Sequence, residues 1–422
     1  MIKKVLPKML FTSVATSALL FSAIAPAFAA ESLLQQDMNA LHTAGNVGAV
    51  AEVVNNGEST QVRSGSIQLD GDKKVPFNAH FRTGSDTKTM VATILLQLEG
   101  EGKLSLDDSV EKWLPGVVDG NGYDGSKITV RELLQHTSGI FDYTTDSGFE
   151  ATFLTPEEFL ANRTHHYEPR DLINIALSHP PVFAPGTNWS YSNTNYIIAG
   201  EVIKAVTGNT WDKELKKRII NPLGLDGTSV PGDSLTIPGP NAEGYNIYTS
   251  DPATRVYTDT TEDNMTWGGS AGAVITTTHD ENRFLSALLK GKLLKPTQLA
   301  EMKNTVDLGP GIGYGLGLLH ETFPCSNGNT GEFWGHDGGV IGYTTYVLGT
   351  PDGNRNLTLS LSTTTFSEYQ YANDSGSATS SVLLDVFCGT SAPSGVASPQ
   401  SQSVTSSPSI MQGLQKIRGP LL

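Results

Sequence analysis

A serine and a lysine three positions apart could act together as a nucleophile and its base. Ser85-Asp86-Thr87-Lys88 opens a segment that becomes strongly apolar after the lysine, which predicts a helix beginning at the serine. Residues three apart lie on one helix face, so the Lys88 amine can reach the Ser85 hydroxyl. A serine hydroxyl attacks poorly until a base takes its proton, and lysine can serve if burial and nearby positive groups lower its pKa. The pair predicts a serine nucleophile, provided that partners for it exist elsewhere in the chain.

Two other serine motifs compete with this one. Ser109-Val110-Glu111-Lys112 repeats the spacing, but it opens a charged surface segment, and we interpret Ser109 as a helix cap. Gly268-Gly269-Ser270-Ala271-Gly272 matches the G-x-S-x-G nucleophile elbow, which needs a strand before the serine and a helix after it. Here polar residues precede the motif and β-branched residues follow it. This stretch therefore predicts a glycine-rich turn.

Two downstream motifs could complete a site around Ser85. In Tyr191-Ser192-Asn193, the phenol can shuttle a proton and Asn193 can hydrogen-bond both Lys88 and a substrate amide, although an ordinary turn and helix cap would explain the same residues. His336-Asp337-Gly338-Gly339 runs directly into strand-like residues. Its glycines would let a strand edge run beside a substrate backbone, with a backbone amide completing an oxyanion hole.

The elements that must position these groups lie at both ends of the chain. Strand patterns occur in hairpin-like pairs near each end, and residues 105–300 resemble short helices and loops broken by Gly and Pro. We therefore expect one sheet built from both ends, with a helical insertion. The predicted strands are 47–54, 61–69, 343–348 and 356–362, and the predicted long helices are 32–43, 85–101 and 377–387.

Composition narrows the classes of protein that the chain can belong to. Its 422 residues suggest about two domains, and an apolar content of 38% with 17% charged residues is typical of a globular protein. The formal net charge of −15 argues against nucleic acid as a partner, since no excess of Lys and Arg is present to neutralise phosphates. The histidines form no metal-binding pattern, and we expect neither a metal nor another cofactor.

The two ends predict export and a tail. Residues 1–29 resemble a secretory signal peptide, with three lysines, an apolar run and the small-residue pattern Ala27-Phe28-Ala29 before cleavage; a membrane anchor is the alternative. We expect a secreted protein without a stable membrane anchor. Residues 389–422, rich in Ser, Pro, Gly and Gln, predict a flexible tail that could be removed. In an oxidising compartment Cys325 and Cys388 can pair, and their spacing fits no zinc site.

Together, the three motifs resemble the ordered signature of the serine β-lactamases and penicillin-binding D-alanyl-D-alanine peptidases: S-x-x-K, then Y-x-N, then K/H-T/S-G. The Tyr-x-Asn element and the histidine of the third motif indicate the class C-like branch, and the chain looks most similar to the secreted, soluble D-alanyl-D-alanine carboxypeptidase/transpeptidase. The likeness spans roughly 32–388. It includes Phe81-Arg82-Thr83-Gly84, Gly313-Tyr314-Gly315-Leu316-Gly317 and both cysteines, which resemble that enzyme's disulfide pair.

The resemblance implies an α/β (α+β) fold, with an antiparallel sheet flanked by helices on both faces and an all-helical domain. The mature part, 30–388, would comprise a sheet domain from about 30–85 and 270–388 and a helical domain from about 105–265, with the site in the cleft between them. The resemblance also implies catalytic roles, with Ser85 as the acylated nucleophile, Lys88 as its base and Tyr191 as the proton shuttle. Asn193 would orient the substrate, and His336 would take the place of the usual lysine. The Ser85 and Gly339 amides would form the oxyanion hole, and Trp267 would be a pocket wall.

Two departures from that peptidase affect the expected substrate. Asp337 stands where Thr or Ser usually helps to bind a substrate carboxylate, and an ionised Asp would repel one, unless it merely faces solvent. Leu318-Leu319-His320 follows the Gly-Tyr-Gly stretch where the peptidase carries arginine.

These features predict a secreted serine hydrolase acting through an acyl-enzyme on D-amino-acid peptides, as a D-alanyl-D-alanine carboxypeptidase does. Its substrates would be small or peptidoglycan-derived peptides, and β-lactams would be covalent inhibitors. A D-aminopeptidase, D-amino-acid amidase, esterase or class C-like β-lactamase on the same fold is the alternative, and a non-catalytic ligand-binding module is the alternative of another class. The oligomeric state stays open.

Overall fold

A computed structural model describes residues 24–249, 254–365 and 369–389 of the 422-residue chain. The expected signal peptide, 1–29, lies outside these residues except for its last six positions, which belong to helix α1. The expected tail, 389–422, lies outside them apart from Gly389.

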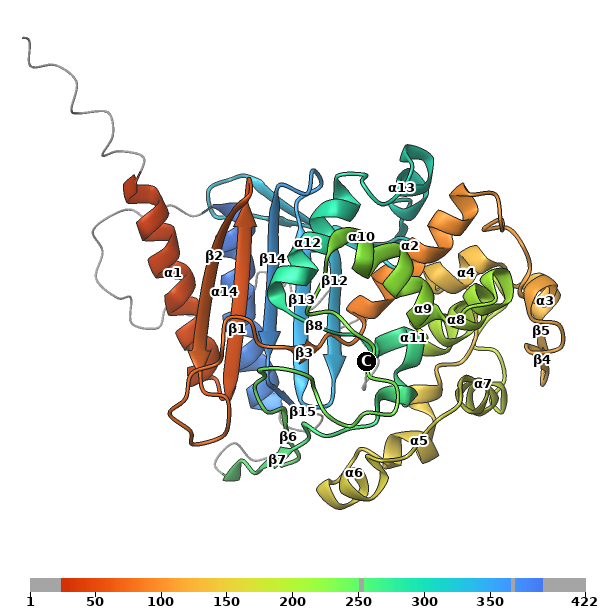
Figure 1. Cartoon of the computed structure of the whole chain (residues 1–422), viewed down its shortest axis with the longest axis horizontal. Coiled ribbons are helices and arrows are strands. Elements are labelled where there is room, and N and C mark those ends of the chain that lie inside the picture. Colours follow the sequence, from red (N-terminus) through yellow and green to blue (C-terminus); the bar gives the residue numbers. More distant parts are fainter. Residues whose placement is uncertain (1–23, 250–253, 366–368, 390–422) are drawn as a thin grey trace, which may run out of the picture.

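One large sheet carries strands from both ends of the chain (Figure 1). Its order is β2-β1-β14-β13-β12-β11-β10-β9, and every neighbouring pair is antiparallel. Strand β1 of the N-terminal hairpin pairs directly with β14, with Ala49 opposite Leu361. This confirms the expected sheet and fold class. The strands are β1 Gly48–Asn55, β2 Glu58–Gly65, β9 Val306–Gly309, β10 Ile312–Tyr314, β11 Leu319–Pro324, β12 Thr330–Val340, β13 Tyr343–Gly349 and β14 Arg355–Leu361.

Short strands form three further small sheets in the described residues. One of them, β3 with β8, runs directly into the segment that carries Ser85. These strands are β3 Phe81–Arg82, β4 Asp119–Gly120, β5 Tyr123–Asp124, β6 Tyr245–Ile247, β7 Tyr257–Asp259, β8 Ile275–Thr276 and β15 Thr363–Thr365.

Helices cover both faces of the large sheet (Figure 1). The terminal helices α1 (Ile24–Thr43) and α14 (Tyr369–Cys388) pack together on one face, over an apolar core shared with β1, β13 and β14. Helices α2 (Asp86–Gly100) and α12 (Thr278–Leu289) pack on the other face. The expected pairing of Cys325 with Cys388 is present, with Cα atoms 5.6 Å apart, and it ties the end of α14 to the loop after β11.

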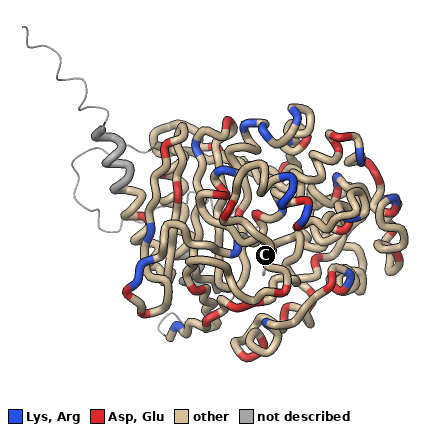
Figure 2. The backbone as a smooth tube through the Cα atoms, viewed as in Figure 1, with Lys and Arg blue, Asp and Glu red and all other residues tan. Residues whose placement is uncertain are grey.

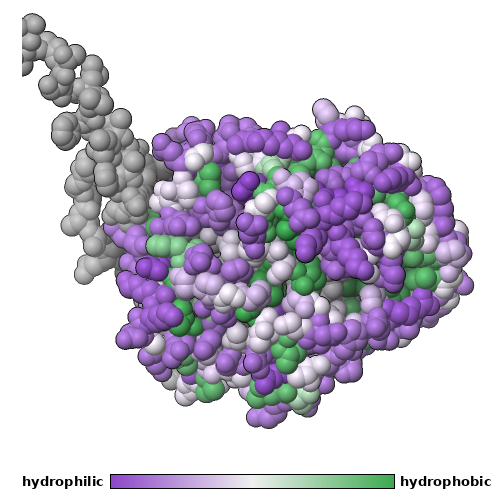
Figure 3. Space-filling view, viewed as in Figure 1, coloured by the Kyte–Doolittle hydropathy of each residue, from purple (hydrophilic) through white to green (hydrophobic). Residues whose placement is uncertain are grey.

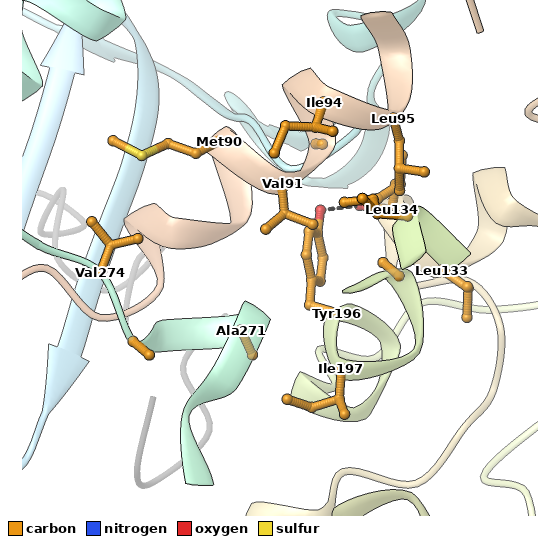
Figure 4. Packing of buried hydrophobic residues seen from close by; sticks show 14 of the residues in the cluster. Met90, Val91, Ile94, Leu95, Leu133, Leu134, Tyr196, Ile197, Ala271 and Val274 are labelled. Atoms are coloured by element: carbon orange, nitrogen blue, oxygen red, sulfur yellow. Dashed lines mark hydrogen bonds between the residues drawn. The ribbon is translucent and has the colours of Figure 1, made fainter. Parts of the chain in front are cut away.

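The helical region lies beside this sheet and packs around α8, whose apolar residues lie at helical spacing. Figure 4 shows its contact with α2: the Tyr196 side chain lies among Val91, Leu133 and Leu134 and donates to the Leu134 carbonyl oxygen at 2.8 Å. The helices are α3 Val110–Trp113, α4 Val130–Gln135, α5 Ser147–Ala151, α6 Pro156–Asn162, α7 Pro169–Leu177, α8 Asn193–Thr207, α9 Trp211–Leu215, α10 Asn221–Leu223, α11 Gly269–Gly272 and α13 Pro296–Met302.

The surface is mainly polar. Acidic and basic residues are interspersed along the chain, with acidic ones in excess (Figure 2), and hydrophobic residues show only as separate spots on the face in Figure 3. No helix within the described ranges has the length and apolar character needed to cross a membrane.

Candidate active site

Ser85 sits in a sharp turn between β3 and α2. Gly84 adopts a positive φ of 61°, and a Cβ at this position would lie 2.8 Å from the Gly339 backbone nitrogen. Only glycine lets this turn approach the third-motif strand so closely. On its other side the turn is anchored by buried Arg82, whose guanidinium donates to three backbone carbonyls, those of Leu235, Thr261 and Asp263. The nucleophile turn is thus held from two directions.

The structure brings Ser85, Lys88 and Tyr191 together. The Lys88 ammonium nitrogen lies 2.8 Å from Ser85 Oγ, and the Tyr191 hydroxyl lies 2.7 Å from the same oxygen. Lys88 donates a second bond, also 2.8 Å, to the Ala271 carbonyl oxygen. Both distances to Ser85 Oγ permit direct proton transfer. Ser85 is 2% exposed and Lys88 is fully buried.

Burial lowers the pKa of Lys88 to about 7, although the nearby acidic groups Asp142 and Asp337 act in the opposite direction. Nearby positive groups were expected to contribute, but the surroundings are acidic, and desolvation makes the ammonium acidic enough to release its proton near neutral pH. Burial raises the pKa of Tyr191 well above its ordinary value, so the phenol keeps its proton. The site therefore contains a proton acceptor and a proton donor at neutral pH.

His136 supports Tyr191, and the sequence patterns gave no sign of it. Its ring centroid lies 4.3 Å from that of Tyr191, and its Nδ1 accepts from the Ser192 backbone N–H at 3.2 Å. Burial lowers the pKa of His136 well below its ordinary value, so the ring is neutral. His136 closes helix α4 in a left-handed conformation, φ 61°, and no local pattern links that position to a tyrosine 55 residues later.

Asn193 lies beside the site in an orientation that differs from the expected one. Its amide nitrogen donates to Asp142 Oδ2 at 3.0 Å and to Thr144 Oγ1 at 3.3 Å, and no hydrogen bond joins it to Lys88. Its Oδ1 is buried and makes no hydrogen bond within the described structure. Asn193 thus presents an acceptor, rather than a donor, as its free group.

His336 lies on β12 with both ring nitrogens engaged. Nδ1 lies 2.6 Å from the Asp337 carbonyl oxygen, and Nε2 lies 2.9 Å from the Tyr314 hydroxyl. A carbonyl oxygen only accepts, so Nδ1 carries the proton, and a neutral ring then accepts from Tyr314 at Nε2. His336 is therefore held by Tyr314 and need not carry the positive charge expected of a lysine replacement.

Asp337 does not face solvent. It is 3% exposed, and its carboxylate raises the pKa of both Lys88 and Tyr191. The solvent-facing alternative is therefore wrong. The two glycines that follow differ from each other: a Cβ at Gly338 would collide with the Thr83 carbonyl oxygen, whereas a Cβ at Gly339 would meet nothing within 4 Å. The strand is thus pressed against the nucleophile turn at Gly338 and has open space beside Gly339.

Trp267 lies elsewhere than expected. Its side chain is 2% exposed and packs in the apolar core with Phe149 and Phe153, and its indole N–H donates to Asp263 at 2.9 Å. The structure therefore assigns it to the core and gives no support to its role as a pocket wall.

The competing serines serve structural roles. Ser109 caps α3 by accepting from the Lys112 backbone N–H, as expected. The stretch expected to be a turn forms the short helix α11, where Ser270 is buried and donates to the Tyr196 carbonyl oxygen at 2.8 Å. The same helix supplies the Ala271 carbonyl that binds Lys88, so the motif builds the site without providing the nucleophile. The described residues contain no group of three or more His, Cys, Asp or Glu side chains arranged to hold a metal ion.

Comparison with known proteins identifies the fold. Residues 30–380 match the Beta-lactamase family. Among curated proteins, penicillin-binding protein 4* of Bacillus subtilis (strain 168) is 28% identical over 306 residues, covering 69% of this chain and 63% of that protein. Penicillin-binding protein 4 of Amycolatopsis lactamdurans is 31% identical over 206 residues, covering 48% of this chain and 49% of that protein. The chain thus spans about half to two thirds of the length of these relatives.

Solved structures show a more extensive likeness. A D-stereospecific amidohydrolase from Streptomyces sp. is 39% identical, with a TM-score of 0.77, and the match covers 86% of this chain and 99% of that one. The D-amino acid amidase of Ochrobactrum anthropi SV3 is 25% identical, with a TM-score of 0.72, covering 85% and 99%. With its antiparallel sheet, its flanking helices and its ordered Ser-Lys, Tyr-Asn and His-Asp-Gly motifs, the chain belongs to the Beta-lactamase family of serine hydrolases and penicillin-binding proteins.

Proposed function

We propose that this protein hydrolyses an amide bond of D-amino-acid substrates through an acyl-enzyme on Ser85. The observation that carries the proposal is the convergence of two proton-transferring groups on one hydroxyl, with Lys88 at 2.8 Å and Tyr191 at 2.7 Å. The likeness to D-stereospecific amidohydrolase and D-amino acid amidase structures supports the choice of a D-amino-acid substrate.

The proposed acylation proceeds as follows. Neutral Lys88 accepts the Ser85 proton while Oγ forms a bond to the substrate carbonyl carbon, and the backbone N–H groups of Ser85 and Gly339 receive the negative charge that develops on the carbonyl oxygen. Tyr191 gives its proton to the leaving nitrogen as the C–N bond breaks, and the proton that Lys88 took from Ser85 then neutralises the Tyr191 phenolate. Water then attacks the ester, with the same groups returning the proton to the serine.

The charges around the site favour a substrate that presents an amine, an amide or an ester rather than a free carboxylate. Asp337 is buried nearby, Asn193 offers an unused acceptor oxygen, and both ring nitrogens of His336 are already hydrogen-bonded. A substrate carboxylate would meet like charge in a poorly hydrated site, which costs several kcal/mol at close range. A substrate N–H or ammonium group would instead find acceptors.

A D-alanyl-D-alanine carboxypeptidase with penicillin-binding activity is the second candidate. The three motifs in their order favour it, as do the curated relatives named penicillin-binding proteins. Under this proposal small or peptidoglycan-derived peptides would be substrates, and a β-lactam would acylate Ser85. Export from the cell, with removal of residues 1–29, belongs to both candidates, and N-terminal sequencing of protein recovered from the medium tests it.

The two candidates are separated by comparing kcat/KM for D-alanine amide, its L-enantiomer and a D-Ala-D-Ala peptide. We expect the D-amide to be preferred over both, and a clear preference for the free-acid peptide would favour the second candidate. Ser85→Ala should abolish turnover and labelling by penicillin, whereas Ser109→Ala, in the other S-x-x-K sequence, should retain both. Turnover unaffected by Ser85→Ala would exclude both candidates, and binding without any turnover would favour the non-catalytic module.

A further inference from the structure

Two buried carboxyl groups lie directly behind the nucleophile turn, and neither takes part in the proposed chemistry. Asp86 follows Ser85 at the start of α2, and Glu281 reaches the same region from α12. Both are almost completely buried. The Thr83 hydroxyl lies between them, 3.3 Å from Asp86 Oδ2 and 3.1 Å from Glu281 Oε1. The other oxygen of each carboxyl group makes no hydrogen bond in the described part of the chain.

Hydrogen-bond geometry determines where a proton must lie. The Thr345 hydroxyl oxygen is 2.7 Å from the Thr83 carbonyl oxygen and 2.6 Å from Asp86 Oδ2. A hydroxyl has one proton, and a carbonyl oxygen can only accept. The Thr345 proton therefore points to the carbonyl, since two oxygens this close repel without a proton between them. The contact with Asp86 then needs a proton supplied by the carboxyl group.

The electrostatic surroundings also favour the protonated, neutral form of Asp86. Burial, and then the charge of Glu281, raise the pKa of Asp86 well above its ordinary value. Burial also raises the pKa of Glu281 to about 8. Facing this pair are Asp337 on β12 and Asp280 on α12, both acidic, and Lys88 on α2, whose own burial favours its neutral form. Ionising Asp86 would place a negative charge among acidic neighbours.

The position of this carboxyl group links the two halves of the proposed site. Thr83 lies two residues before Ser85, and Thr345 is paired across the sheet with Gly338. A Cβ at Gly338 would lie 2.8 Å from Asp86 Oδ2, so the third-motif strand passes directly over this group. Asp86 thus bridges the turn that carries Ser85 and strand β13, which pairs directly with β12, the strand that carries Gly339.

We propose that Asp86 is a positioning residue that works as a neutral carboxylic acid. It donates to Thr345 on β13 and so holds β13, together with the paired strand β12 that carries Gly339, against the Ser85 turn. Loss of its proton removes one bond of this bridge and adds repulsion from Glu281 and Asp337. The strand then moves away from the turn and activity falls. This inference rests on the proposed role of Ser85 in amide hydrolysis.

The first test is the pH profile of kcat on D-alanine amide. Wild-type activity should fall at alkaline pH as Asp86 ionises. Asp86→Asn keeps an uncharged donor of the same shape, so it should retain measurable activity and lose this alkaline decrease. Asp86→Ala should lower kcat at least tenfold at every pH, with KM changed less.

Glu281→Gln removes a negative neighbour of Asp86 and should shift the alkaline decrease to lower pH. Exposed Asp119→Asn is the matched control and should reproduce the wild-type profile.

The second test does not depend on activity. Glu281 would also be protonated at neutral pH, so the test compares infrared difference spectra: wild type minus Asp86→Asn should contain a carbonyl band of a protonated carboxyl group that wild type minus Asp119→Asn lacks. Absence of that band, or an alkaline decrease that Asp86→Asn leaves unchanged, would overturn the inference. If no D-amino-acid amide is turned over while the band behaves as expected, the proposed function fails and the neutral state of Asp86 stands.

Discussion

At the residue scale, the chemistry depends on opposite effects of the same burial. Desolvation favours the neutral form of every group, so it turns the Lys88 ammonium into an amine that can accept a proton and keeps the Tyr191 phenol protonated. Two groups that would both be protonated in water thereby acquire different roles around Ser85. Their acidic neighbours reduce this effect on Lys88 without cancelling it.

The pH dependence of acylation follows from the state of Lys88. With a pKa of about 7, the amine is mostly protonated below neutral pH and cannot accept the serine proton. We therefore expect kcat/KM for a D-amide to rise with pH through about 7, as expected for a general base, and to reach a plateau before the alkaline decrease expected from Asp86. A profile that is flat from acid to neutral pH would contradict the assignment of Lys88 as the base.

Tyr191→Phe should separate proton transfer from packing. The ring remains 4.9 Å from the Lys88 nitrogen and keeps its contact with the His136 ring, so the fold should be kept. Loss of the hydroxyl removes the proton donor, and kcat should fall roughly a hundredfold to ten-thousandfold with little change in KM. Steady-state kinetics combined with thermal denaturation checks both expectations, and an unchanged kcat would remove Tyr191 from the proposed mechanism.

At the element scale, the site is made by a helix start and a strand that press against each other. Helix α2 presents Ser85 and Lys88 on one face, because residues three apart share it. Strand β12 can pass within contact distance only because positions 84 and 338 are glycines. The alignment of Ser85 with β12 is therefore a property of their packing and belongs to neither element alone.

Gly338→Ala tests this close approach. The added methyl group would meet the Thr83 carbonyl oxygen and Thr345, so the free energy of unfolding should drop by about 1–3 kcal/mol, the usual cost of overpacking. Gly339→Ala, one residue further, meets nothing within 4 Å and should leave that free energy nearly unchanged. Urea denaturation of both variants provides the measurement. A loss of unfolding free energy in Gly338→Ala no larger than that in Gly339→Ala would contradict the prediction.

At the scale of the whole molecule, the two ends of the described structure lie side by side in the sheet and on one of its faces. The N-terminal hairpin pairs with β14, and helices α1 and α14 pack together on one face. The Cys325–Cys388 bond fixes the end of this last helix to the strands that lead into the third motif. Both ends of the described structure thus contribute to the sheet that carries the third motif.

Replacing both cysteines with serine should destabilise the protein. The bond closes a loop with a sequence separation of 63 residues, and its removal should cost roughly 2–4 kcal/mol of unfolding free energy, mainly by giving the unfolded chain more freedom. Urea denaturation of the double variant and of the wild type, each with and without reductant, checks this. Reductant should weaken only the wild type, and no difference between the two proteins would contradict the prediction.

The sequence by itself determined the features that depend on local pattern. Apolar spacing predicted α2 and the strands at both ends, because helices and strands bury one face with a fixed period. The spacing of Ser85 and Lys88 on that helix already placed the amine beside the hydroxyl. The order of the three motifs indicated the family, which the comparisons confirm.

The tertiary structure decided what depends on neighbours from distant segments. Asn193 turns its amide toward Asp142, His336 has its Nε2 engaged by Tyr314, and Trp267 is enclosed by Phe149 and Phe153. A side chain's partners, its solvent exposure and its proton depend on which groups fold against it, and no period in the sequence encodes them. Asp86 is the clearest case: its sequence position suggests an ordinary charged residue, and only Thr345, 259 residues away, reveals that it needs a proton.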